Sequence, residues 1–187
     1  MEDIFHSWDH RFKKSTDELS QGQREARQIR FGVLGMVGMA KILDRLGYQS
    51  FLPTPEQDAQ GKVDLWVLPK NKNWQEGFVG VQLKTSINGI RGVSARVVDE
   101  KTARHAVSER EEKQLKAMLH FIKDYGRINQ VSVFGVWVDL TGTSEYEIVD
   151  GVTGEVNFDR VSQEDLEELV QVLEQAKGGE KSETDSA

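Results

Sequence analysis

Apolar positions recur at helical spacing in three segments of the chain. The first spans residues 20–47, and its second half is apolar on nearly all sides, which indicates deep burial. Gly32, Gly35 and Gly38 lie within it, and we expect them to permit close packing against the helix backbone. The second spans residues 108–126, where Ser108 and Glu111 match a capping box. The third is an amphipathic helix over residues 162–177.

Five other segments have the composition of β-strands, because they are short and rich in β-branched and aromatic residues. They are residues 48–52, 63–69, 78–84, 131–140 and 144–150. The fourth is almost continuously apolar, as expected of a strand that is buried on both faces. Residues 85–107 fit neither period and predict an extended loop. The order α-β-β-β-α-β-β-α predicts an α/β fold in which helices flank a mixed central sheet.

The length and composition indicate one globular domain with polar ends. The chain of 187 residues divides into an N-terminal arm (1–19), a single α/β domain (20–177) and an acidic tail (178–187) that we expect to be disordered. The absence of cysteine excludes disulfides and thiolate metal sites. No apolar run reaches the roughly 18 residues of a membrane span, and the N-terminus lacks a signal-peptide core. We therefore expect a cytoplasmic protein that does not associate with membranes.

The charge is distributed unevenly along the chain. The net charge of −7 combines +4 over residues 1–138 with −11 over residues 139–187. An anionic ligand responds to the local potential, so the first region permits a nucleic-acid surface despite the overall acidity. The acidic C-terminal region predicts either a solvated face or a contact surface for a protein partner or a second copy of the chain.

Polar residues interrupt two of the predicted strands, and their phase suggests a single site. Side chains alternate in a strand, so Gln82 and Lys84 point to the same face, and Asp64 is out of phase with its apolar neighbours. If the two strands pair as a hairpin, the three groups meet. Their oxygens, with the backbone carbonyl of Leu83, suit magnesium, and Lys84 would assist the attacking water in phosphodiester hydrolysis. The alternative is an open, solvated face of the sheet.

Asp64, a spacer of 17 residues and then "QLK" resemble the PD-(D/E)XK nuclease superfamily in its QxK variant. The resemblance covers roughly residues 22–140 and implies a restriction-endonuclease-like fold. It also implies Mg²⁺ or Mn²⁺ as cofactor and DNA as substrate, in restriction, repair or mobile-element biology. Asp64 and Gln82 would then hold the metal, with Lys84 as the third catalytic group.

One feature of the family pattern is missing from the first predicted helix. The family usually carries a glutamate there, but the corresponding positions, Gly35 and Met36, are not acidic. Glu25 is our first choice as a substitute metal ligand, and Glu56 and Asp58 in the segment before Asp64 are the alternatives. If no acid takes this place, we expect a catalytically inactive domain of the same fold that acts as a nucleic-acid-binding or protein-interaction module.

Basic residues near these segments suggest contacts with the phosphate backbone of DNA. The candidates are Arg91, Arg96, Lys101 and Arg104 in the predicted loop, and Lys13 and Lys14 in the arm. Their alternative role is that of an ordinary solvated surface.

Overall fold

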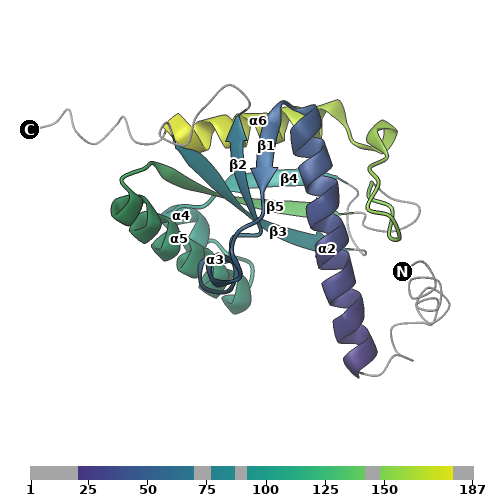
Figure 1. Cartoon of the computed structure of the whole chain (residues 1–187), viewed down its shortest axis with the longest axis horizontal. Helices are drawn as coiled ribbons and strands as arrows, with labels where there is room; N and C mark the ends of the chain where they lie inside the picture. The colour runs from purple at the N-terminus through teal and green to yellow at the C-terminus, as the bar shows by residue number, and fades with distance from the viewer. Residues whose placement is uncertain (1–20, 70–76, 87–91, 142–147, 179–187) are drawn as a thin grey trace, which may run out of the picture.

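A five-stranded mixed sheet lies at the centre of the protein (Figure 1). The computed structural model describes residues 21–69, 77–86, 92–141 and 148–178. The strands are β1 (Tyr48–Phe51), β2 (Leu65–Pro69), β3 (Phe78–Ser86), β4 (Val93–Val97) and β5 (Val133–Thr141). Their order across the sheet is β1-β2-β3-β5-β4. The first three pair antiparallel, β5 runs parallel to β3, and β4 pairs antiparallel with β5 at the edge.

Helices cover both faces of this sheet. The helices are α2 (Gln21–Arg45), α3 (Pro55–Gly61), α4 (Glu100–Arg104), α5 (Glu109–Asn129) and α6 (Gln163–Gly178), with a short 3₁₀ turn at Phe158–Arg160. Helices α2 and α6 pack on one face, and α5 packs on the other with α3 and α4 against it. Part of α2 extends past the sheet (Figure 1). None of the helices in the described ranges is long and apolar enough to cross a membrane.

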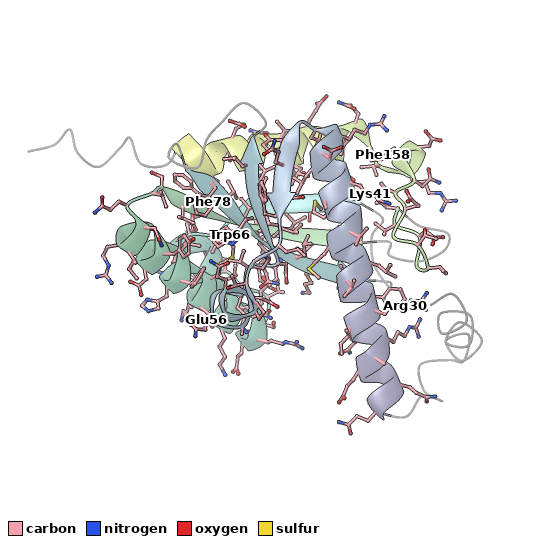
Figure 2. All side chains as sticks on the ribbon, viewed as in Figure 1. Arg30, Lys41, Glu56, Trp66, Phe78 and Phe158 are labelled. Carbon is pink, nitrogen blue, oxygen red and sulfur yellow. The ribbon has the colours of Figure 1, made fainter. Side chains whose placement is uncertain are left out.

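Strand alternation divides the core into two layers. On β5, Val136, Val138 and Leu140 face α2 and α6, whereas Trp137 faces α5. The strand is therefore buried on both sides, as its apolar run predicts. On β2, Trp66 faces α5 and forms an aromatic cluster with Phe78, Phe121 and Tyr125, with Trp66 and Phe78 labelled in Figure 2.

Helix α3 delivers the chain into β2. Thr54 caps it with a complete capping box to Gln57, and Pro55 occupies its first turn. The Oε1 atom of Gln57 accepts hydrogen bonds from the backbone N–H of Thr54 at 2.9 Å and from Nε1 of Trp66 at 3.1 Å. Helix α3 is thereby tied to the strand that follows Asp64.

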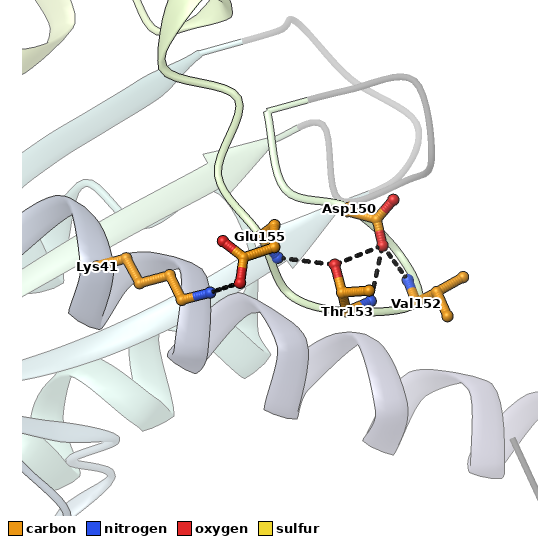
Figure 3. Close-up of polar contacts among 5 residues, drawn as sticks. All are labelled: Lys41, Asp150, Val152, Thr153 and Glu155. Atoms are coloured by element: carbon orange, nitrogen blue, oxygen red, sulfur yellow. Dashed lines mark hydrogen bonds and ion pairs between the residues drawn. The ribbon is translucent and has the colours of Figure 1, made fainter. Parts of the chain in front are cut away.

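The loop that follows β5 lies against α2 (Figure 3). Lys41 on α2 forms a 2.5 Å ion pair with Glu155. Within the loop, Oδ1 of Asp150 accepts hydrogen bonds from the backbone N–H groups of Val152 and Thr153 and from the Thr153 hydroxyl, at 2.9, 2.7 and 2.9 Å. Burial alone would raise the pKa of Asp150, but these bonds outweigh it and lower the pKa below its ordinary value. The loop is thus closed by an ionised carboxylate.

The structure confirms several sequence predictions and corrects others. The first three strands and the three long helices lie where the periodicity places them, although α5 continues past residue 126 to Asn129. The predicted loop at 85–107 is wrong, because it contains β4 and α4, which are formed by pairing with β5 and by the Asp99 N-cap. Residues 148–150 of the predicted strand at 144–150 make only an isolated bridge, Val149 to Val156, and the rest lies outside the described residues. Helix α3 was not predicted.

Of Gly32, Gly35 and Gly38 on α2, two allow close approach of a neighbouring side chain. A Cβ on Gly35 would lie 2.1 Å from Cγ2 of Thr85 on β3, and one on Gly38 would lie 2.6 Å from Cγ2 of Val149. At Gly32 there is nothing within 4 Å. Close packing is therefore confirmed for Gly35 and Gly38, and it is the contact at Gly35 that sets α2 against the polar end of β3.

We expect Gly35→Ala to lower the free energy of unfolding by about 1–3 kcal/mol, because overpacking against Thr85 outweighs the gain in helix propensity. The matched control is Gly32→Ala, which should raise it by up to about 1 kcal/mol. Urea unfolding followed by circular dichroism measures both. Equal stabilities of the two variants would contradict the close contact.

Candidate active site

The carboxylate of Asp64 is bound to the polar end of β3. Asp64 lies just before β2, and its backbone N–H donates to the carbonyl of Val81 at 2.8 Å, which continues the pairing of the two strands. Its Oδ2 atom accepts a hydrogen bond from the backbone N–H of Leu83 at 2.6 Å and a second one from Nε2 of Gln82. The predicted meeting of Asp64 and Gln82 is thus present, and both bonds use the same carboxylate oxygen.

Gln82 is buried by α5, with 9% of its surface exposed. Its Nε2 bonds Asp64 and also donates to the carbonyl of Leu83 at 3.3 Å. Its Oε1 atom is buried and has no hydrogen-bond partner among the described residues. A buried acceptor without a partner costs free energy on the order of 1–3 kcal/mol. The alternative of an open, solvated sheet face is therefore wrong at this position.

Burial raises the pKa of Asp64 from its ordinary value of 3.8 to about 6. The hydrogen bond from Leu83 and the charge of Lys62 lower it, while the charge of Asp58 raises it, and burial is the largest effect. The donors on Oδ2 are both uncharged. The positive charge around Asp64 is therefore too small to offset the cost of burying its ionised carboxylate.

Three side chains form a row across the sheet on the face covered by α5. Gln82 on β3 pairs in register with Trp137 on β5, which pairs with Arg96 on β4. The guanidinium of Arg96 lies over the Trp137 ring, 5.6 Å from its centroid. Asp64 extends this row at the β2 side through its bond to Gln82. The candidate site thus lies at the β2 end of a row of side chains on the face of the sheet that α5 covers.

Lys84 lies two residues beyond Gln82 on the same face and remains accessible, with 54% of its side chain exposed. Its Nζ atom is 3.9 Å from Oε2 of Glu111 on α5. Glu111 is only 3% exposed, and its Oε1 forms a short ion pair with Nη2 of Arg96. A buried carboxylate therefore lies between the two cations.

Glu111 is the residue of this site that the sequence did not reveal. Its position three residues after Ser108 suggested a capping box. Ser108 does cap α5 by accepting a hydrogen bond from the backbone N–H of Glu111 at 3.2 Å, but the Glu111 carboxylate turns toward Arg96 and Lys84. The only signal was an acid at the start of the helix after the QLK strand, and caps of that kind are common.

The remaining predicted site residues are distributed differently. Glu25 is exposed on the first turns of α2 and accepts a hydrogen bond from Gln21. It precedes Gly35, the point of contact with β3, by ten residues, or about 15 Å of helix. Lys101 and Arg104 are exposed on α4, where Arg104 pairs with Glu100 at 3.7 Å. The other three candidates, Arg91, Lys13 and Lys14, lie outside the described residues.

The oxygens at the end of β3 have the chemistry that a hard divalent cation prefers. They are the Asp64 carboxylate, the carbonyl of Leu83 and the unpartnered Oε1 of Gln82, but Gln82 turns its Nε2 toward the other two, so cation binding would require this amide to turn over. Magnesium binds through one or two carboxylates together with waters and substrate phosphates. Within the described ranges, no group of three acidic, histidine or cysteine side chains could hold a metal ion. Any cation here would therefore depend on waters and substrate for much of its shell.

Comparison of the chain with protein-family models, with curated proteins and with solved structures found no match.

The raised pKa of Asp64 predicts a pH-dependent stability in the absence of divalent cations. A carboxyl whose pKa is higher in the folded state contributes stability that is fully present below about pH 4 and is lost as the pH rises through about 6. Asp64→Asn removes this titration and keeps an oxygen that can accept from Leu83. Wild type loses stability over this pH range and the variant does not. The difference in free energy of unfolding between the variant and wild type should therefore shift in favour of the variant by roughly 2–3 kcal/mol from about pH 4 to about pH 7.5. Urea unfolding at several pH values measures the difference, and parallel curves would contradict it.

Proposed function

We propose that this protein is a metal-dependent nuclease that hydrolyses phosphodiester bonds of DNA at the end of β3. The observation that carries the proposal is the pairing of Asp64 with Gln82, whose buried Oε1 has no partner among the described residues. This pair joins the two strands on which the PD-(D/E)XK resemblance depends. An accessible lysine follows on the same face.

The topology supports the likeness to the restriction-endonuclease-like fold. Helix α2 is followed by the antiparallel strands β1, β2 and β3, and α5 then leads to β5, parallel to β3. The resemblance implies this succession of a helix, three strands, a helix and a strand. Strand β4 is an addition at the edge, inserted between β3 and α5.

The roles of the side chains follow from their positions. Asp64, ionised above about pH 6, would hold the cation together with the carbonyl of Leu83 and, once the Gln82 amide turns over, its Oε1. When bound, the cation supplies a Lewis acid that polarises the phosphate and acidifies a water. The Lys84 ammonium, exposed beside the pair, would donate to a phosphate oxygen or orient the attacking water. Lys101 and Arg104, on the exposed side of α4, are the described candidates for contacts with the DNA backbone.

A second candidate function is a nucleic-acid-binding module of the same fold without catalysis. One observation favours it. The group formed by Asp64, Gln82 and Leu83 contains a single carboxylate, and Glu25, the proposed second acid, lies well along α2 from the contact with β3. Such a module would bind DNA in a salt-dependent way and leave it intact.

A cleavage assay separates the two functions. We expect wild type to nick supercoiled plasmid in Mg²⁺ or Mn²⁺, and Lys84→Ala and Asp64→Asn to lower the rate by about a hundredfold or more, within the range for loss of one catalytic group. Lys116→Ala is the matched control, because Lys116 is an exposed lysine on α5, 62% accessible, that pairs with Glu112. Salt-sensitive DNA binding without nicking, on duplex, single-stranded and branched DNA, would favour the binding module instead.

Metal binding is testable without turnover. Because a cation competes with the proton on Asp64, millimolar Mg²⁺ should raise the melting temperature clearly at about pH 8 and little at about pH 5. Gln82→Met, which removes Oε1 at similar volume, should abolish the shift. Gln175→Met on the exposed side of α6 should retain it. Differential scanning fluorimetry and calorimetric titration measure both effects, and a Mg²⁺ shift unaffected by Gln82→Met would place the cation elsewhere.

A further inference from the structure

The ammonium of Lys84 has a fixed negative group beside it. Lysine carries its charge on a flexible four-carbon stem, so an exposed ammonium samples many positions unless something attracts it to one. Oε2 of Glu111, 3.9 Å from Nζ, provides such an attraction. This distance exceeds that of a hydrogen bond, so the protons of the ammonium remain available to another acceptor.

Glu111 is itself held in place from three directions. It lies in the first turn of α5, where the helix N-terminus favours a negative charge. Its backbone N–H is bound to Ser108, and its Oε1 is bound to Arg96. The guanidinium of Arg96 in turn lies over Trp137, the neighbour of Gln82 in the sheet. The carboxylate is therefore held at the β4 side of the row of side chains whose opposite end is Asp64.

We propose that Glu111 is a positioning residue for the Lys84 ammonium, which leaves β3 two residues beyond Gln82 on the same face, with Arg96 fixing the carboxylate. This role rests on the proposed nuclease function. Oε1 is used for Arg96 and Oε2 faces Lys84, so one carboxylate links the packed interior to the reactive cation. Loss of Glu111 would leave Lys84 in the chain but free to leave its working position. Misplacement of a catalytic group by about 1 Å costs up to about a hundredfold in rate.

The experiment compares activity with stability in a double-mutant cycle. Glu111→Gln should lower kcat between about tenfold and about a hundredfold and change KM little. It should also lower stability, because Arg96 loses its partner. The variant Glu111→Gln with Arg96→Met removes both charges of the ion pair, and methionine keeps an apolar stem over Trp137. It should regain stability while kcat stays low.

Arg96→Met alone keeps the attraction between Glu111 and Lys84, so kcat should fall less than in Glu111→Gln. These rates and urea unfolding curves are measured on the full chain with supercoiled plasmid. If the double variant regains both stability and kcat, Glu111 only neutralises Arg96, and the positioning role is overturned. A loss confined to KM would overturn it as well. If wild type itself does not cleave DNA, the proposed function fails first and the role of Glu111 fails with it.

Discussion

The hydrogen bonds to the Asp64 carboxylate are the contacts on which the candidate site depends. They join the residue that precedes β2 to the side chain of Gln82 and the backbone of Leu83. Because β3 continues from there to Lys84, these bonds also set where the lysine leaves the sheet relative to the carboxylate. Gly35 contributes from the opposite face, since only a residue without a side chain lets α2 approach Thr85, the next residue of β3. The polar end of β3 is thus fixed from both sides of the sheet.

The two carboxylates of this region differ in their surroundings. Glu111 has a cation at each of its oxygens: Arg96 is paired with Oε1, and Lys84 lies 3.9 Å from Oε2. Asp64 has only uncharged donors, and the charge of Lys62 does not offset its burial, so its pKa rises to about 6. A divalent cation stabilises a buried carboxylate that has only uncharged donors more than it stabilises a carboxylate that is already paired with a cation. This contrast favours Asp64 as the ligand of the proposed cation and Glu111 as the partner of the lysine.

The fold and the site differ in how much of each the sequence reveals. The phase of Asp64 and Gln82 was readable because strand alternation is local and both residues interrupt apolar runs. Strand β4 could not be predicted, because Val93–Val97 forms a strand by pairing with β5, about forty residues away in the sequence. Helix α3 has a readable signal in Thr54, Pro55 and Gln57, which form its capping box and first turn. The role of Glu111 could not be predicted either, because its side chain is directed by the ion pair with Arg96, which lies on this unpredicted strand.

The ion pair of Glu111 with Arg96 bears on the choice between the two proposed functions, DNA cleavage and DNA binding without catalysis. This ion pair joins a carboxylate that is 3% exposed to a guanidinium that is 35% exposed, so the desolvation of Glu111 offsets much of the attraction and the pair contributes little net stability. A DNA-binding surface needs exposed cations, and Lys84 would serve that purpose in any position within reach of a phosphate. Catalysis, in contrast, requires the ammonium at one place relative to the Asp64–Gln82 pair. The burial of Glu111 beside Lys84 is therefore better explained by a reaction than by binding alone.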